Sequence, residues 1–460
     1  MKEIIIYSLN DFHGMIFPNE SCCGISKIGE FIINQKKNND CVIVLSAGDM
    51  FQGGSVSTLT KGEALVEAMN IIGFDAMTIG NHEFDWDIET VLKYNDYNKD
   101  NGELNCKFII SNIIYKDSKE KPEWALPYIT FIKDGLKFGV IGIIGEEQEK
   151  DILKMYVSKY EFTNEFESIK KYSKVLHCEE KCDIVILCAH TDTTNINLDI
   201  TNFCDDEKVD VIINGHTHQA YYGEYTNNDK CVPYVQSGSY GKYLGYIKLE
   251  YDEINKRVVN CEVSNINTKT FNKNNTMIDE ALKKYQDYID LSNTRYGTLN
   301  CNLEKNIVLD MITEKLKNEY HKDISIINTG GIRSVAFPLN EGDVIKYEDL
   351  FKMMPFENYI VTCKVSGKDL KNVLNLNGLC FSNINFDIVN DKVYDVVTID
   401  FALLANEAIF GDYKDYCNTN ILIRDFIIKM IKNNCLNWRY KITWGFWKMT
   451  FQITWGYNDL

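Results

Sequence analysis

Residues 73–85 read Gly-Phe-Asp-Ala-Met-Thr-Ile-Gly-Asn-His-Glu-Phe-Asp. The apolar run 76–79 predicts a short buried strand, and Gly80 allows the chain to turn tightly directly after it. Asn81 and His82 then follow the carboxyl end of that strand, which is where ligands bind in open α/β sheets. The stretch therefore predicts an α/β protein with a polar site at its strand ends.

Four further polar clusters follow apolar, strand-like runs in the same way. They are Asp11-Phe12-His13 after residues 4–9, Gly48-Asp49 after 42–46, His190 after 184–189, and Gly215-His216-Thr217-His218 after 209–214. Because parallel strands end at one edge of a sheet, the five clusters are expected to converge. They contain five of the seven histidines, so we interpret them as a metal site.

The types of residue in these clusters limit the metals that they can bind. Carboxylate, imidazole and amide oxygen together suit Zn, Mn, Fe or Co better than Ca or Cu(I). In an extended segment, residues two apart point to the same side, so Asp11 can act with His13. A carboxylate such as Asp49 can bridge two ions about 3.5–4 Å apart, a spacing that stabilises both oxygens in a displacement at phosphorus.

The order of apolar runs and helical patterns predicts an α/β layout in both halves of the chain. In the first half, strands are expected at 4–9, 41–46, 76–79, 108–111, 136–143, 183–187 and 209–213, and helices at 24–35, 62–72, 88–95 and 163–177. Polar residues 264–275 mark a boundary, and a charged helix at 277–291 follows. The second half has its own signals, including a strand at 393–401. Residues 438–460 are Trp-rich and are interpreted most simply as an added hairpin or a packed extension.

Composition excludes some classes of function. Apolar residues make up 45% of the 460-residue chain, so a substantial core can form. A net charge of −17 argues against binding to nucleic acid or to anionic membranes, because both require clustered positive charge. No run approaches the roughly 20 apolar residues of a membrane span, and no export signal is visible. The fifteen cysteines lack a C-x-x-C pair, so we expect reduced thiols in a cytoplasmic protein.

The five clusters resemble the complete motif series of the calcineurin-like metallophosphoesterases. Residues 48–53, 73–85, 328–333 and 354–358 narrow the resemblance to the branch of 5′-nucleotidases and 2′,3′-cyclic phosphodiesterases. The resemblance covers most of residues 1–435. It implies a four-layer α/β catalytic domain (1–262), a linker with a bridging helix (263–295) and a smaller α/β substrate-binding domain (296–435). The Trp-rich tail (436–460) has no counterpart and no assigned role.

The resemblance also implies two divalent metal ions and a role for each polar residue of the site. One ion would be held by Asp11, His13, Asp49 and His218, and the other by Asp49, Asn81, His190 and His216, with Asp49 bridging. His82 would contact the scissile phosphate, and Asp85 would orient its ring, since a carboxylate behind an imidazole fixes its tautomer. The nucleophile would be a metal-activated water.

The second half would hold the remainder of the substrate. By the same resemblance, Asn328 and Arg333 would contact it, and Phe356 and Phe401 would clamp a nucleobase, since every base has a flat face that stacks. The chain departs from the family at two places. Residues 406–412 replace a Gly-Gly-Asp motif, which leaves Asp412 as the match, and no arginine aligns near residues 297–304.

The expected reaction is metal-dependent hydrolysis of a nucleoside 5′-monophosphate to a nucleoside and phosphate. Alternatives within the class are a 2′,3′-cyclic nucleotide and a nucleotide sugar or other diphosphate derivative. An alternative of a different class is a non-catalytic nucleotide-binding protein, and a third is a working catalytic domain whose second domain takes another phosphorylated ligand. The expected partner is a small nucleotide, not nucleic acid or a membrane, and the oligomeric state is not predicted.

Overall fold

The computed structural model describes residues 1–98, 100, 102–191, 194–204, 206–227, 230–299, 301–405, 410–434, 438–444 and 447–453. The chain forms two compact units, Met1–Gln286 and Asp287–Leu460. Within the described ranges, no helix has both the length and the apolar character needed to span a membrane.

The first unit contains two six-stranded sheets. The first sheet has the strand order β14-β13-β1-β2-β3-β4. Its strands are β1 (Lys2–Leu9), β2 (Val42–Ser46), β3 (Ala76–Thr78), β4 (Lys107–Ile109), β13 (Tyr243–Asp252) and β14 (Arg257–Asn267). The other has the order β11-β12-β10-β9-β7-β6, and its strands are β6 (Tyr128–Lys133), β7 (Leu136–Ile144), β9 (Ile184–His190), β10 (Val211–Gly215), β11 (Ala220–Asn227) and β12 (Lys230–Ser237). The short strands β5 (Ile113–Tyr115) and β8 (Tyr160–Phe162) pair separately.

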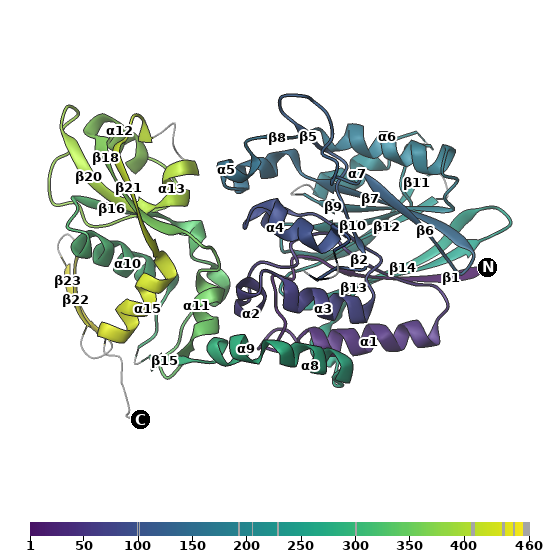
Figure 1. Cartoon of the computed structure of the whole chain (residues 1–460), viewed down its shortest axis with the longest axis horizontal. Helices are drawn as coiled ribbons and strands as arrows, with labels where there is room; N and C mark the ends of the chain where they lie inside the picture. The colour runs from purple at the N-terminus through teal and green to yellow at the C-terminus, as the bar shows by residue number, and fades with distance from the viewer. Residues whose placement is uncertain are drawn as a thin grey trace. The chain divides into compact units, whose positions relative to one another are not determined.

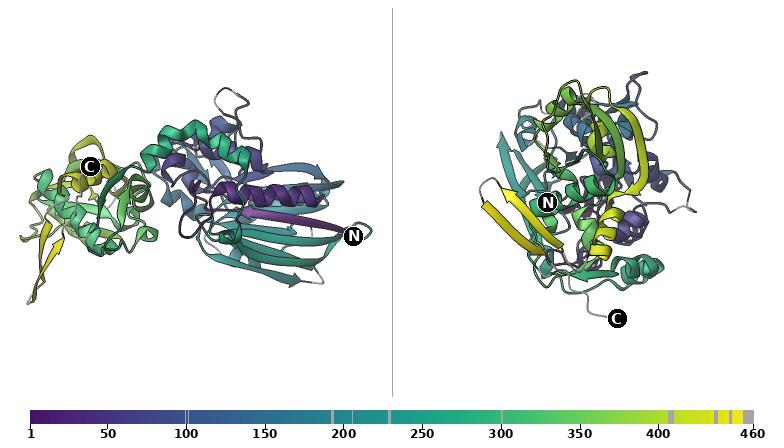
Figure 2. Two further views of the ribbon diagram at one scale, coloured as in Figure 1. Left: turned by 90° about the horizontal axis from the view of Figure 1, so that it is seen from below. Right: turned by 90° about the vertical axis from the view of Figure 1, so that its left-hand side faces the viewer.

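Helices cover the outer face of each sheet (Figure 1). The longer ones are α1 (Ile25–Asn38) and α3 (Glu63–Ile72) on the first sheet, and α6 (Glu165–Cys178) and α7 (Thr194–Ile200) on the second. Shorter helices are α2 (Ser55–Leu59), α4 (Ile88–Leu92), α5 (Lys154–Val157) and α8 (Thr276–Leu282), and α9 (Gln286–Ser292) leads into the second unit. Helix α1 lies along β1 (Figure 2, left), where the rings of Phe31 and Tyr7 meet edge to face at 5.7 Å.

The core of the first unit lies between the two sheets. Ile4 and Ile6 of β1 and Ile43 and Leu45 of β2 pack with apolar residues of β7, β9, β10 and β12. A separate cluster joins the second sheet to α6 and α7. Central parallel strands are buried on both faces, which explains their continuous apolar runs. The prediction of a four-layer α/β unit is confirmed.

The second unit is built on a five-stranded sheet of order β19-β16-β20-β18-β21. Its strands are β16 (Ile324–Asn328), β18 (Tyr359–Ser366), β19 (Leu379–Phe381), β20 (Val393–Ile399) and β21 (Lys414–Leu422). One face packs on α10 (Lys305–Glu319), α11 (Tyr347–Met353) and α15 (Ile423–Asn434), and the other packs on α12 (Gly367–Leu374) and α13 (Asp400–Ala405). Strands β15 (Arg295–Thr298) and β17 (Val344–Lys346) form a small ribbon.

Two details of the second half differ from or add to the prediction. The strand expected at 393–401 ends at Ile399, because Asp400 begins α13 and its carboxylate accepts the backbone N–H of Phe401 at 2.8 Å. In the Trp-rich tail, β22 (Trp438–Trp444) and β23 (Trp447–Ile453) pair as an antiparallel hairpin. The rest of that tail lies outside the described residues.

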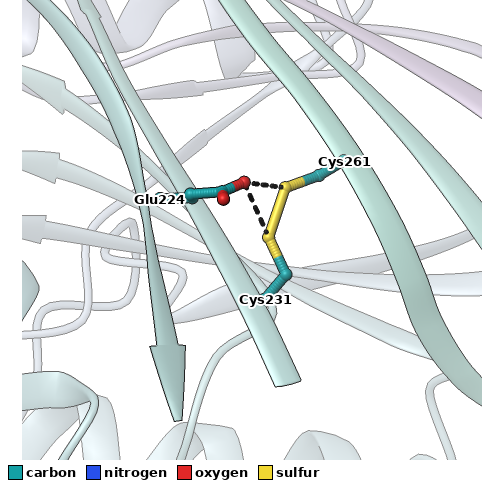
Figure 3. Close-up of a disulfide and its surroundings, with 3 residues drawn as sticks. All are labelled: Glu224, Cys231 and Cys261. Atoms are coloured by element: carbon teal, nitrogen blue, oxygen red, sulfur yellow. Dashed lines mark hydrogen bonds between the residues drawn. A yellow bond between two sulfur atoms is a disulfide. The ribbon is translucent and has the colours of Figure 1, made fainter. Parts of the chain in front are cut away.

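The prediction that the cysteines are reduced is wrong for one pair. Cys231 of β12 and Cys261 of the edge strand β14 form a disulfide between the two sheets, beside Glu224 of β11 (Figure 3). The two cysteines are 30 residues apart, and no short motif marks them. Twelve other cysteines are free thiols among the described residues. The disulfide removes the argument from reduced thiols on which the cytoplasmic prediction rested.

Candidate metal centre

The five strand-end clusters meet at one place in the first unit. Strands β1, β2 and β3 of one sheet and β9 and β10 of the other all end there, at Leu9, Ser46, Thr78, His190 and Gly215. The connections that follow bring together two groups of ligand atoms, and the atoms of each group lie within 4.8 Å of one another. These groups are Asp11, His13 and His218, and Asp49, His190 and His216. A third group, His13, Asp49 and His82, lies between them.

Short distances between ligand atoms show how closely each group converges. Nε2 of His13 lies 3.0 Å from Nε2 of His218, which is itself 3.5 Å from Oδ1 of Asp11. In the other group, Nε2 of His190 lies 3.0 Å from Oδ1 of Asn81 and 3.1 Å from Oδ2 of Asp49. Oδ1 of Asn81 also lies 3.0 Å from Nδ1 of His216. All seven predicted ligands therefore lie at one centre.

Backbone carbonyls fix the tautomers of two of these histidines. Nδ1 of His13 donates to the carbonyl oxygen of Gln52 at 2.9 Å, and Nδ1 of His190 donates to that of Ala47 at 2.6 Å. A carbonyl oxygen only accepts, so the proton is on Nδ1 and Nε2 keeps its lone pair in the neutral ring. Both rings are therefore oriented as metal ligands normally are.

Five of the seven predicted ligands have a left-handed backbone, with φ between +49° and +83°. They are Asp11, His13, Asp49, His216 and His218. Such a conformation costs about 1–3 kcal/mol for a residue other than glycine, and it is concentrated at functional sites. The strands thus deliver the side chains to this centre through strained turns, which the surrounding hydrogen bonds stabilise.

The buried carboxylates give this centre a strong preference for positive charge. Asp11 and Asp49 are almost completely buried, and Oδ2 of Asp49, although 3.1 Å from Nε2 of His190, accepts no hydrogen bond from any described residue. Burial alone would lower the pKa of His190, but the charges of Asp49 and Asp11 raise it to about 10. Burial raises the pKa of Asp11 to about 7. The donor set and the orphaned carboxylate oxygen both fit divalent cations.

Comparison with known proteins agrees with this geometry. Residues 6–220 match the family described as calcineurin-like phosphoesterase, and residues 287–388 match the 5′-nucleotidase C-terminal domain. The chain belongs to the calcineurin-like metallophosphoesterases of the 5′-nucleotidase type. It is therefore a hydrolase of phosphoester bonds.

Relatives match this phosphoesterase over most of its length. A 5′-nucleotidase of Vibrio vulnificus is 24% identical over 94% of this chain and 90% of its own length. A 5′-nucleotidase of Rattus norvegicus is 27% identical over 80% of this chain and 70% of its own length. The crystal structure of a 5′-nucleotidase precursor from Thermus thermophilus has a TM-score of 0.79 at 18% identity, covering 94% of this chain and 96% of that one. The last match supports the fold alone.

Glu83 is a positioning residue to which the sequence alone assigned no role. Its carboxylate is completely buried and accepts the backbone N–H groups of Gly80 at 2.8 Å, Asp49 at 2.9 Å and Met50 at 2.9 Å. It thereby joins the turns that carry Asp49 and Asn81. Burial raises the pKa of Glu83 to about 7, because the three donors only partly offset desolvation and the charge of Asp49.

Gly80 allows these two turns to approach closely. A Cβ atom added there would lie 2.3 Å from Oδ1 of Asp49 and 2.8 Å from the ring of His190. Any larger residue would therefore displace two ligands, which gives a steric reason for glycine at this position.

His82 lies beside the ligands without completing either main group. Its Nδ1 is 2.9 Å from Oδ2 of Asp85, as predicted, and its backbone N–H donates to Oδ1 of Asp49 at 2.9 Å. Its ring meets that of His13 with centroids 5.2 Å apart. Tyr240, which the sequence-based reasoning did not identify, packs against His13 and His218 at 5.2 and 5.4 Å.

The predicted substrate residues occupy different environments in the second unit. Asn328 ends β16, and its buried Oδ1 has no hydrogen-bond partner within the described part of the chain. The guanidinium of Arg333 lies 5.7 Å from the centroid of Phe356. Phe401 lies on α13 and packs against the apolar core. Asp412 is exposed, and residues 406–409 lie outside the described ranges.

Proposed function

We propose that this phosphoesterase hydrolyses a nucleoside 5′-monophosphate to a nucleoside and phosphate, using two divalent metal ions. The observation that carries the proposal is the position of Asp49. Its carboxylate belongs to two of the converging groups, one with His190 and His216 and the other with His13 and His82. A carboxylate placed between two sets of ligands is what a dinuclear centre requires.

The proposed ligands divide between the two ions as expected from the sequence. Asp11, His13 and His218 serve one side of Asp49, and Asn81, His190 and His216 serve the other. Their carboxylate, imidazole and amide atoms suit Zn, Mn, Co or Fe. Such ions, when bound, provide a water nucleophile at neutral pH and neutralise charge on the phosphate.

His82 is proposed to stabilise the phosphate in the transition state. Its Nδ1 faces the carboxylate of Asp85, so Nε2 is directed away from that pair. Asp85 favours the protonated ring, which can donate to a phosphate oxygen as negative charge develops there.

The second unit is proposed to hold the nucleoside. Arg333 and Phe356 supply a cation and an aromatic ring next to each other, and the unpartnered Oδ1 of Asn328 offers an acceptor on the same connection after β16. Stacking on Phe356 would bind any base with little selectivity. The nucleotide, rather than a simple phosphate ester, is supported by this unit and by the relatives called 5′-nucleotidases.

A substrate panel tests the proposal. Phosphate release would be measured with AMP, UMP, ADP, 2′,3′-cyclic AMP, UDP-glucose and p-nitrophenyl phosphate, each with Mn²⁺, Zn²⁺, Co²⁺ or chelator. We expect metal-dependent turnover with the highest kcat/KM for a 5′-monophosphate. Turnover of p-nitrophenyl phosphate alone would contradict the nucleotide assignment while leaving the metal centre intact.

A further inference from the structure

A cavity lies at the end of the first unit that is opposite to the candidate metal centre. It has a volume of about 300 Å³ and is lined by the residues that begin β9, β10, β12 and β14 and end α6 and β13. Tyr251 in its wall pairs with Lys2, so it lies at the end marked by the N-terminus (Figure 1). Strand β9 spans about 20 Å between this end and His190, so the cavity is separate from the catalytic site.

The rim of this cavity carries an excess of positive charge. Four cationic side chains line it: Lys181, Lys208, Lys256 and Arg257. Only two acidic side chains, Asp183 and Asp210, oppose them, so the formal charge of these six residues is +2. The whole chain, with these residues included, has a net charge of −17, so the cavity differs in sign from the protein as a whole. Lys181, Lys256 and Arg257 make no ion pair or side-chain hydrogen bond with any described residue.

The two acidic residues of the rim are already engaged in holding strand ends. Oδ2 of Asp210 accepts the backbone N–H of Val185 at 2.8 Å, and Oδ2 of Asp183 accepts that of Lys137 at 2.9 Å. Their carboxylates therefore stabilise the turns that shape the cavity. Lys181, Lys256 and Arg257 have long side chains that can turn toward a ligand.

Apolar side chains form part of the wall of the cavity. Val209, Val232, Val258 and Tyr251 line it, and all four are buried. Small-molecule sites are typically apolar hollows of about 300–1,000 Å³ with a few charged groups that orient the ligand. Lysine and arginine at the rim are the groups that bind phosphate and sulfonate oxygens through charge-assisted hydrogen bonds.

We propose that this basic cavity, defined by Lys181, Lys208, Lys256, Arg257 and Tyr251, is a second binding site of the protein. Its ligand class is a small organic anion that carries a phosphate or sulfonate group on an apolar body. The anionic group lies at the rim cations, and the body contacts Tyr251 and the valines. The site is distinct from the catalytic centre in position and needs no metal.

Binding of 1-anilinonaphthalene-8-sulfonate to the metal-loaded protein tests the proposal, because this probe combines a sulfonate with an apolar body and fluoresces when bound. Three proteins are compared: the native chain, the double variant Lys256→Glu/Arg257→Glu, and the control Lys37→Glu. Lys37 lies in the last turn of α1 and outside the cavity. Turnover of p-nitrophenyl phosphate reports that each variant is folded, since no substituted residue belongs to the metal centre.

We expect one saturable site whose affinity falls at least tenfold in the double variant and is unchanged in Lys37→Glu. Inorganic phosphate should displace the probe from the native protein at constant ionic strength, which would show that the anionic group alone is recognised. Equal affinity in the native and double-variant proteins would overturn the proposal. An equal loss in Lys37→Glu would also overturn it, because the probe would then be sensing net charge rather than this cavity.

Discussion

At the scale of single residues, the centre is organised by groups that never need to touch the substrate. Glu83 accepts three backbone N–H groups from the two turns that present Asp49 and Asn81. The carbonyls of Gln52 and Ala47 set the ring orientation of His13 and His190. Such outer contacts hold ligands in place and commonly change metal affinity when they are lost.

Replacing Glu83 with glutamine should weaken metal binding more than a surface change would. The glutamine oxygen can still accept, but its NH₂ group would face a backbone donor, so one N–H loses its partner. We expect metal affinity to fall about 10–100-fold and the free energy of unfolding by about 1–3 kcal/mol. Calorimetric titration with Mn²⁺ and urea unfolding measure these effects. The matched control is Glu89→Gln on the exposed face of α4, and unchanged Mn²⁺ affinity in Glu83→Gln would rule out the positioning role.

The convergence of the predicted ligands could be foreseen from sequence because each comes soon after an apolar run. Asp11, Asp49, Asn81, His190 and His216 all come within three residues of a strand end, so the local pattern and the rule for strand ends locate them together. The role of Glu83 could not be predicted in this way, because its carboxylate accepts a backbone hydrogen bond from Met50, 33 residues away. Nothing in its own neighbourhood in the sequence reports that contact.

At the scale of secondary-structure elements, the buried strands were predicted well, but the end of one strand and a covalent bond between the two sheets were not. The runs at 4–9, 41–46 and 136–143 are mainly apolar and bounded by polar residues, a pattern that favours a buried strand. Phe401 was placed at the end of a strand, but Asp400 starts a helix there, and Phe401 therefore faces the core. The disulfide was not predicted because it joins strands of two different sheets, and the stacking of these sheets depends on contacts distant in sequence.

The Cys231–Cys261 disulfide should stabilise the first unit, because it closes a loop of about 30 residues in the unfolded chain. The double variant Cys231→Ser/Cys261→Ser is expected to lose about 2–4 kcal/mol of unfolding free energy. Urea unfolding under non-reducing conditions measures the loss. The control is Cys204→Ser, which removes an exposed free thiol. Equal stability of the two variants would show that the bond does not contribute.

At the scale of the whole molecule, the two units have separate cores and separate kinds of polar residue. The first unit holds the predicted ligands, and the second holds the cation and ring of Arg333 and Phe356. Chemistry and recognition of the leaving group are thus expected to respond to different substitutions. The family motifs made this division predictable, whereas the basic cavity was not, because its lining comes from six elements.

Arg333→Ala should impair use of nucleotides and spare a substrate without a nucleoside. Loss of a charged hydrogen bond costs about 1.5–3 kcal/mol, so we expect kcat/KM for AMP to fall about 10–100-fold while that for p-nitrophenyl phosphate stays unchanged. Steady-state kinetics with both substrates separates the two effects. Arg295→Ala, at an exposed arginine of β15, is the control. An equal fall for both substrates would contradict recognition by the second unit.

The most direct test of the central claim is phosphate release from AMP with Mn²⁺ by the native protein, Asp49→Asn, His82→Ala and the control His321→Ala. His321 is exposed and lies outside the centre. We expect turnover that chelator abolishes, that falls at least about 100-fold in Asp49→Asn and His82→Ala, and that His321→Ala retains. Turnover that persists in chelator, or at native rates in Asp49→Asn, would contradict a metal centre bridged by Asp49.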